Sequence, residues 1–316
     1  MPAILFVPNL KPQSLTSLKF ALNSANIEHH VFTEKPLALN AILTCPAGTP
    51  LFVGTEPEFV DIIHATRKHA GHTLALVMLS RKLSHLPDDV RNEICGDAFV
   101  AQENDRFDIP EILIILNKFL SGNIFGLDHY VSSRISTSQY MVNNRDSKDL
   151  VLGRIFDGVM EYGQDILGSK FRFFAQRIST IADELIMNSV FHANPRLQAE
   201  DRSCNFELAA QECVSVEWRY DGRYFGLSVS DQFGNLEKNT VLRYLTHLFP
   251  ATMTQQRKTG GVGLKYVYEQ IEKLVVNVDR GRRTEIICLV SMLMPKRTNL
   301  KTPKSFHYFT PKNSVS

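Results

Sequence analysis

The order of helical and strand-like patterns changes between residues 122 and 151, and this change constrains the fold most. In residues 1–122, short apolar runs alternate with helical patterns, which is typical of an α/β domain with a parallel sheet. From residue 151 onward, two helical patterns precede pairs of strands, and this order predicts an α+β sandwich. The 316 residues are enough for two such domains, at roughly 150 residues each.

The expected strands are short apolar runs bounded by turn signals. In the first half they cover residues 3–7, 51–53, 73–79 and 98–101, with helices at 57–69 and 109–120. In the second half, helices at about 151–166 and 171–193 precede strands at 213–220, 224–231, 273–279 and 284–293. We therefore expect domains at 1–122 and 151–294, a connector at 123–150 and a tail at 295–316.

The size and strand order of residues 1–122 resemble a response-regulator receiver domain. The resemblance implies an acidic pair after the first strand and a phosphate-accepting Asp after the third. This chain instead has Pro-Asn-Leu at 8–10 and Val-Gly-Thr at 53–55. Ser80 fits the hydroxyl position of the family, but Gln102 stands about where its Lys would be. We therefore expect a pseudo-receiver that works by contact and does not accept phosphate.

Charge and cysteine content exclude several classes of protein. Lys and Arg number 35 and Asp and Glu 33, and a formal charge of +2 is too small to predict direct nucleic-acid binding. The five scattered cysteines lack CxxC spacing, so we expect reduced thiols. The N-terminal apolar run is too short for a signal peptide, and no run approaches the roughly 20 residues of a membrane span. These features predict a cytoplasmic protein.

The two segments outside the expected domains are polar. The stretch SSRISTSQYMVNNRDSKD within 123–150 has no clear period, which is typical of a connector. The tail at 295–316 contains five Lys or Arg residues and no acidic residue, so we expect it to be solvated.

The helix expected at 171–193 carries the most informative pattern. One inward stripe is formed by Phe171, Phe174, Ile178, Ile181 and Leu185. The next position on that stripe is Asn188, with Glu184 one turn before it and His192 one turn after it. These residues form either a hydrogen-bonded network or a ligand site, because a buried unpaired carboxylate or amide is costly. In a ligand site, Asn188 would supply an oxygen to a cation and Glu184 would orient or deprotonate a hydroxyl.

Two turn signals follow in the chain. The strand at 224–231 ends on Asp231, which begins either an ordinary turn or a binding loop. The sequence TGGVGL at 259–264 opens a helix, and its glycines would let a ligand approach the N–H groups of the helix start. Each signal alone is more often a plain turn. A P-loop, GxxxxGK followed by Ser or Thr, does not occur.

Taken in order, these motifs resemble the ATP-binding domain of the GHKL superfamily, which includes histidine kinases, gyrase, MutL and anti-sigma-factor kinases. The resemblance covers about residues 151–294 and implies a Bergerat-type α+β sandwich with ATP and Mg²⁺ as cofactors. The segment ADELIMNSVFHA is most similar to the serine-kinase branch of anti-sigma factors. That branch implies a regulatory protein partner of the sigma-like or anti-anti-sigma-like kind.

The resemblance also implies roles for the matching residues. Glu184 would be the general base and Asn188 the magnesium ligand. Asp231 would bind the adenine amino group, with Thr284 close to the adenine. The glycines that would approach the phosphates are Gly260, Gly261 and Gly263.

One departure concerns the residues after Asp231. The family usually has Asp-x-Gly-x-Gly, whereas this chain has Asp-Gln-Phe-Gly-Asn at 231–235. Phe233 replaces a glycine that lets the backbone pass close to the nucleotide. Either Gly234 takes the place of the missing glycine, or the nucleotide site binds weakly. The departure therefore affects the expected turnover of ATP more than the expected fold.

The stretch from 236 to 258 joins the two glycine-containing turns and is expected to form a mobile lid. It is long and ends in polar and basic residues that continue a helix poorly. Near its end, Lys258 or Arg257 would either reach the terminal phosphate or be a solvated charge.

Three functions of different class remain open at this level. The first is a magnesium-dependent protein kinase of the anti-sigma type. The second is a sensor histidine kinase, for which His129 is the only candidate phosphate acceptor in 123–170 and lacks a neighbouring acid after it. The third is an interaction module for which nucleotide is a conformational ligand. A homodimer is compatible with each of them.

Overall fold

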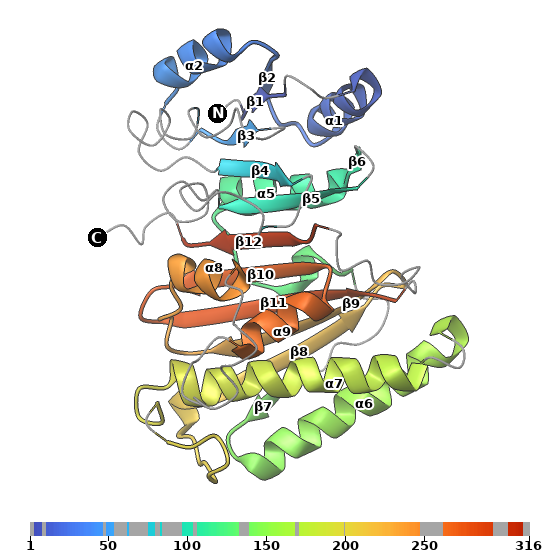
Figure 1. Ribbon diagram of the computed structural model, residues 1–316, viewed down its shortest axis with the longest axis vertical. Coiled ribbons are helices and arrows are strands. Elements are labelled where there is room, and N and C mark those ends of the chain that lie inside the picture. Colours follow the sequence, from blue (N-terminus) through green and yellow to red (C-terminus); the bar gives the residue numbers. More distant parts are fainter. Residues whose placement is uncertain are drawn as a thin grey trace. The chain divides into compact units, whose positions relative to one another are not determined.

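A computed structural model describes residues 3–7, 11–46, 49–53, 62, 75–79, 83, 97–103, 106–132, 139–167, 171–198, 200–246, 262–292 and 303–311. The chain divides into two compact units. Unit 1 comprises residues 1–124 and 301–309, and unit 2 comprises residues 125–300 and 310–316. Each unit contains hydrogen-bonded strands with helices packed on them (Figure 1).

Unit 1 is built on parallel strands. In chain order they are β1 (Ala3–Phe6), β2 (His29–Phe32), β3 (Leu51–Val53), β4 (Ala75–Leu79) and β5 (Ala98–Glu103). Their spatial order is β2-β1-β3-β4-β5, with parallel pairing throughout. This is one of the two common strand orders of doubly wound α/β sheets. A two-residue strand, β6 (Arg106–Phe107), pairs with β5.

The described α-helices of unit 1 each have a proline in their first turn. They are α1 (Pro12–Ser24), α2 (Lys35–Thr44) and α5 (Ile109–Ser121). Each has Pro in its first two positions, where the missing N–H is not needed for the helix. Helix α5 ends at Gly122, whose φ of 72° is a left-handed conformation that favours glycine.

Most elements predicted for this half are confirmed. The strands expected at 3–7, 51–53, 73–79 and 98–101 correspond to β1, β3, β4 and β5, and the helix expected at 109–120 is α5. The helix expected at 57–69 lies outside the described residues, apart from Ile62. Strand β2 was not predicted, because its sequence HHVF is short and only partly buried.

The prediction of a solvated tail is wrong for residues 305–309. They form β12 (Ser305–Phe309), which pairs antiparallel with β5. The ring of Phe306 lies 6.3 Å from that of Phe99, and Nε2 of His307 lies 2.8 Å from Oε1 of Glu111. All of these side chains are buried. The aromatic residues favour a buried strand, and their burial outweighs the basic flanks.

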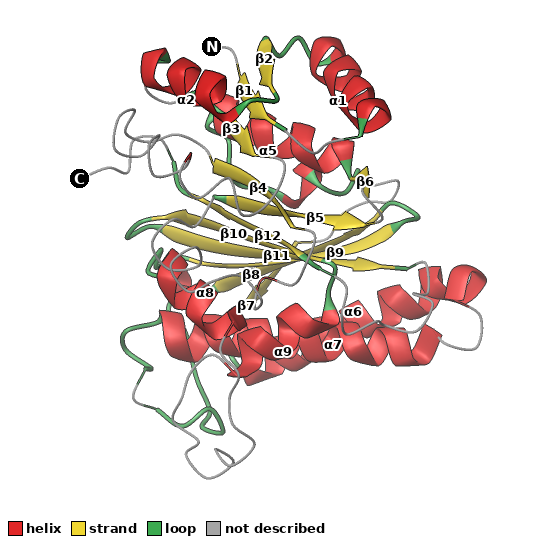
Figure 2. Ribbon diagram, turned by 45° about the horizontal axis from the view of Figure 1, so that its top comes forward, coloured by secondary structure: helices red, strands yellow, loops and turns green. Residues whose placement is uncertain are grey.

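Unit 2 combines an antiparallel sheet with helices. Its strands are β7 (Gln139–Val142), β8 (Val214–Tyr220), β9 (Tyr224–Asp231), β10 (Lys273–Asp279) and β11 (Arg283–Ser291). Their order is β7-β8-β9-β11-β10, with antiparallel pairing throughout. The α-helices in its described part are α6 (Arg145–Leu167), α7 (Phe171–Asn188), α8 (Lys238–Thr246) and α9 (Val262–Gln270). Figure 2 shows α6, α7 and α9 on the same side of these strands.

The two faces of this sheet carry different neighbours. On the helix face, Phe225 of β9 lies edge-to-face with Phe174 of α7, at a centroid distance of 6.4 Å. On the opposite, outer face, a Cβ atom at Gly226 would lie 2.7 Å from Val131 and 2.8 Å from Leu127. Side chains alternate along a strand, so Asp231 shares the helix face with Phe225.

The stretch 123–150, expected to be a linker or an ordered connector, is ordered over most of its described length and contributes to unit 2. Residues 127–131 pack on the outer face, and β7 pairs with β8. Helix α6 begins at Arg145 rather than near 151, because Asn144 and Ser147 cap it. Oδ1 of Asn144 accepts a hydrogen bond from the Ser147 N–H at 2.8 Å, and Oγ of Ser147 accepts one from the Asn144 N–H at 3.0 Å.

Two expectations drawn from the sequence concern membrane-spanning helices and cysteines. Within the described part of the chain, no helix has both the length and the apolar character needed to cross a membrane. The described cysteines, which are Cys45, Cys204, Cys213 and Cys288, form no disulfide.

Candidate functional site

Helix α7 carries the predicted polar residues at the edge of its apolar stripe. Phe174, Ile178, Ile181 and Leu185 are buried, as the periodicity predicts. Glu184 and Asn188 are only partly buried. His192 is exposed, although its ring lies close enough to Arg202 and Glu184 to feel their charges. Among the described residues, no hydrogen bond of the Asn188 side chain is found.

A π-helical turn, η4 (Ser189–Ala193), follows Asn188 directly. Such turns are rare in proteins overall, but they occur frequently at functional sites, where they redirect the side chains around them. The carbonyl oxygen of Ala193 accepts a hydrogen bond from Nδ2 of Asn235 at 2.8 Å. The end of the α7 segment is thereby joined to the turn after β9. The apolar periodicity gave no sign of this turn, since it predicted one continuous helix to residue 193.

Glu184 takes part in an ion pair that the sequence did not predict. Its Oε1 atom accepts a hydrogen bond from the guanidinium of Arg202 at 3.0 Å. Desolvation of its ring lowers the pKa of His192, Arg202 lowers it further, and Glu184 opposes both effects. His192 is therefore uncharged at neutral pH, and Arg202 supplies the positive charge beside Glu184.

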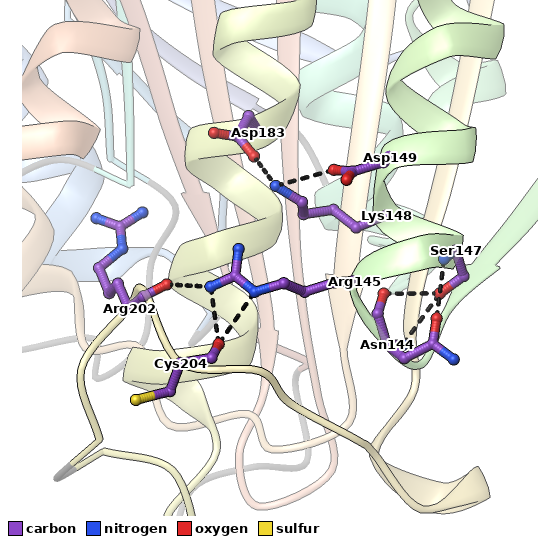
Figure 3. Close-up of polar contacts among 8 residues, drawn as sticks. All are labelled: Asn144, Arg145, Ser147, Lys148, Asp149, Asp183, Arg202 and Cys204. Carbon is purple, nitrogen blue, oxygen red and sulfur yellow. Dashed lines mark hydrogen bonds and ion pairs between the residues drawn. The ribbon is translucent and has the colours of Figure 1, made fainter.

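The backbone around Arg202 is held by the start of α6 (Figure 3). The guanidinium of Arg145 donates to the carbonyl oxygen of Arg202 at 2.6 Å and to that of Cys204 at 2.7 Å. Nζ of Lys148 lies 2.7 Å from Oδ1 of Asp183, the residue before Glu184 on α7. These contacts connect α6 to the chain segments that carry Glu184 and Arg202.

Asp231 and Thr284 form a buried polar pair on the helix face. They lie opposite each other on β9 and β11 and are 4% and 2% exposed. Burial raises the pKa of Asp231 to about 6, although the N–H groups of Phe233 and Gly234 and the nearby Thr284 partly oppose this shift. The Thr284 hydroxyl is close enough to favour the charged carboxylate but makes no hydrogen bond within the described part of the chain. A buried hydroxyl without a partner is uncommon in a folded protein.

The turn after Asp231 also has a packing explanation. Oδ1 of Asp231 accepts a hydrogen bond from the Phe233 N–H at 2.9 Å, which is an ordinary Asx turn. Gly234 has a φ of 62°, and a Cβ atom there would overlap the backbone of Asp279 in the β10–β11 turn. Glycine is therefore required at position 234 by the fold itself.

The glycine-rich segment reaches Glu184 through Gly263. Gly263 lies in the first turn of α9, and a methyl group added there would overlap the Glu184 carboxylate. A larger residue at position 263 would therefore displace the Glu184 carboxylate from its present position. Three other predicted residues, Gly260, Gly261 and Lys258, lie outside the described residues. In the predicted lid at 236–258, helix α8 is described and residues 247–258 are not.

Few side chains among the described residues beside α9 could coordinate a metal ion. Among the described residues, no group of three or more His, Cys, Asp or Glu side chains could hold a metal ion. Glu184 and Asn188 provide one carboxylate and one amide, one helical turn apart. Such a set fits a hydrated Mg²⁺, which keeps several waters and takes other oxygens from substrate phosphates.

Sequence reasoning missed both arginines. The Asn-Arg-Asp-Ser stretch at 144–147 is a helix-start signal that would have placed Arg145 at the beginning of α6. No local pattern marks Arg202, because its contact with Glu184 depends on how the segment between η4 and β8 folds back.

The chain matches no protein-family model, and no curated protein matches it significantly. Functional conclusions therefore rest on the residues and geometry of the site.

Proposed function

We infer that unit 2 binds an adenine nucleotide with Mg²⁺ and that the protein is a GHKL-type kinase acting on a Ser or Thr of a regulatory partner. The observation that carries this inference is the buried pair Asp231 and Thr284. A desolvated carboxylate beside a hydroxyl that has no hydrogen-bond partner among the described residues is costly to the fold. Adenine has an amino group that donates and ring nitrogens that accept, so it matches both groups.

The approach of α9 to Glu184 supports a phosphate site next to this pair. The N-terminus of a helix attracts anions through its free N–H groups and its dipole. Gly263 brings that N-terminus against Glu184, and Asn188 lies one turn further along α7. The hydrogen bond between Asn235 and Ala193 links the turn after Asp231 to the end of the same helical segment.

The roles of the side chains follow from their chemistry. Asn188 would hold Mg²⁺, which would neutralise the charge of the phosphates. Glu184 would accept the proton of the substrate hydroxyl, the task of a general base. Positioning and charge screening supply most of the catalysis in phosphoryl transfer, so this small set of groups is sufficient.

A second function, a nucleotide-binding interaction module, is favoured by the ion pair at Glu184. A carboxylate that accepts a hydrogen bond from Arg202 is less available to take a proton from a substrate. In such a module, ATP would favour one conformation over another without turnover. The two functions share one binding site and differ in whether phosphate is transferred.

Asp231→Asn tests the nucleotide site. Asparagine keeps the Asx turn but loses the charged acceptor, so we expect ATP affinity to fall by at least about tenfold, the loss of one charge-assisted hydrogen bond. The control is Asp221→Asn at the other end of β9, where Oδ1 accepts hydrogen bonds from Arg223 and Tyr224 at 2.8 Å. Calorimetric titration with Mg-ATP measures both. Equal affinities in the two variants would contradict the proposed role of Asp231.

A further inference from the structure

Arg202 lies beside Glu184 in the proposed nucleotide site and has no role there yet. Its guanidinium donates to Glu184 at 3.0 Å, and Gly263 brings the first turn of α9 against the same carboxylate. One cation, one carboxylate and one helix start therefore meet at a single place. Arg202 belongs to none of the motifs found in the sequence.

The backbone at Arg202 is fixed independently of its side chain. The carbonyl oxygen of Asp201 accepts a hydrogen bond from the Cys204 N–H at 2.9 Å, which closes a tight turn around Arg202. Arg145 donates to the carbonyl oxygens of Arg202 and Cys204, so α6 anchors this turn. The Arg202 side chain is 37% exposed and the Glu184 side chain 22%. The guanidinium can therefore change partner by rotating its side chain while the turn stays in place.

Charge favours a phosphate as the alternative partner. Glu184 offers Arg202 one carboxylate, whereas the terminal phosphate of ATP offers more negative charge and three acceptor oxygens. The planar guanidinium matches phosphate well and keeps its charge at all physiological pH values. A phosphate bound at the start of α9 would therefore compete with Glu184 for Arg202.

We propose that Arg202 is a phosphate-sensing residue that pairs with Glu184 in the absence of a terminal phosphate and with the terminal phosphate of bound ATP. This assignment rests on the proposed nucleotide-binding function and deepens it. It makes Arg202 the residue that distinguishes ATP from ADP. The exchange also releases Glu184, so the proton acceptor becomes available only when a phosphoryl donor is bound.

Calorimetric titration of the full chain with Mg-ATP and with Mg-ADP tests this assignment. We expect the wild type to prefer ATP by about tenfold or more, the value of a charge-assisted hydrogen bond. Arg202→Gln should bring the preference close to one while ADP affinity stays within about twofold, and Arg202→Lys should retain part of the preference. The matched control is Arg196→Gln in the same segment, whose guanidinium pairs with Glu212 at 2.7 Å. It should keep the full preference.

The outcomes separate this assignment from the proposed function. An unchanged ATP preference in Arg202→Gln would overturn the assignment and leave the nucleotide site standing. A parallel loss of ATP and ADP affinity would show a merely structural role and would overturn it too. If Arg202→Gln does not fold, Arg202→Lys decides. A full preference for ATP over ADP in Arg202→Lys overturns the assignment to the planar guanidinium of Arg202, and a reduced preference supports it. A wild type that binds neither nucleotide would refute the proposed function and, with it, the role of Arg202.

Discussion

The two faces of the unit 2 sheet carry buried acidic side chains that differ in their hydrogen-bonding neighbours. On the outer face, Glu285 accepts hydrogen bonds from Asn277 at 2.8 Å, from Ser228 at 3.0 Å and from the Gly126 N–H at 3.0 Å. Arg283 lies 3.6 Å from the same carboxylate. The Glu285 carboxylate therefore has its acceptor positions filled by the protein.

On the helix face, one residue before Glu285, the buried hydroxyl of Thr284 has no hydrogen-bond partner in the described part of the chain. The opposing Asp231 is desolvated enough to raise its pKa to about 6. A saturated buried network stabilises a fold, whereas an unsaturated one has capacity left for a ligand. The comparison separates a structural carboxylate from a candidate binding group within two adjacent strands.

The largest effect is expected on the helix side, at Glu184. Glu184→Gln keeps the shape and the hydrogen-bonding capacity but loses the base, so hydrolysis or phosphoryl transfer should fall by roughly 10²–10⁴. ATP affinity should stay within a few-fold of the wild type. A coupled assay of ADP release, with and without candidate partner proteins, measures the first quantity, and calorimetry measures the second. Glu161→Gln on the exposed side of α6 is the control and should change neither.

A wild type without turnover on any partner, together with full cellular function of Glu184→Gln, would contradict the kinase function. The interaction module would then be the remaining proposal for unit 2.

The next effect belongs to the outer face. Glu285→Ala removes the buried acceptor of the hydrogen bonds from Asn277, Ser228 and Gly126, so we expect unit 2 to lose about 3–5 kcal/mol of unfolding free energy. The single tryptophan of the chain, Trp218, stacks on Tyr140 at 4.9 Å within unit 2, so its fluorescence follows this unit during urea unfolding.

The matched control on the outer face is Glu217→Ala. Glu217 is partly exposed and pairs with Arg219 at 2.6 Å, so its loss should cost below about 1 kcal/mol. Equal destabilisation by the two substitutions would remove the contrast between a saturated buried network and a surface pair.

A smaller and opposite effect on stability is expected at Asp231. Its folded pKa of about 6 lies above the ordinary 3.8, so the folded state binds more protons between pH 4 and pH 6. The unfolding free energy therefore falls as pH rises through this window, by at most about 1.4 kcal/mol per pH unit. Asp231→Asn should remove this dependence and be at least as stable as the wild type at pH 8. Urea unfolding followed by Trp218 fluorescence at several pH values measures this effect, and the same pH dependence in the variant and the wild type would contradict the account.

The smallest effect concerns nucleotide affinity as a function of pH. If the charged carboxylate binds the adenine amino group, ATP affinity should fall about fourfold between pH 7 and pH 5.5, as Asp231 with its pKa of about 6 is protonated. Calorimetric titrations of wild type and Asp231→Asn correct for protonation of the nucleotide itself, since both bind the same ATP. Parallel pH profiles in the two proteins would exclude Asp231 from the pH dependence.

The sequence predicted the regular elements of both units better than it predicted their edges. Apolar runs such as AILF and LFV became fully or largely buried strands because burial of such runs dominates local preference. Strand β12 was assigned to a solvated tail, since five basic residues hid the apolar character of SFHYF. Its burial depends on pairing with β5, about 200 residues earlier in the chain, which no local pattern reveals.

The candidate site divides in the same way. Glu184, Asn188 and Asp231 could be named from spacing, because helix periodicity and strand ends fix where such side chains point. The buried state of Thr284 and its position opposite Asp231 required the register of β9 and β11. The contact between Arg202 and Glu184 required the turn that Arg145 anchors, and sequence spacing carries no information on it.

The central claim is that the helix face of unit 2 binds adenine through Asp231 and Thr284, and calorimetric titration of the wild-type protein with ATP and with GTP tests it most directly. Guanine presents an acceptor oxygen where adenine presents its amino group, so GTP would face the Asp231 carboxylate unfavourably. We predict measurable ATP binding that Mg²⁺ strengthens and at least about tenfold weaker binding of GTP, the value of one lost charge-assisted hydrogen bond. Equal affinity for the two nucleotides, or no heat with ATP, would contradict the claim.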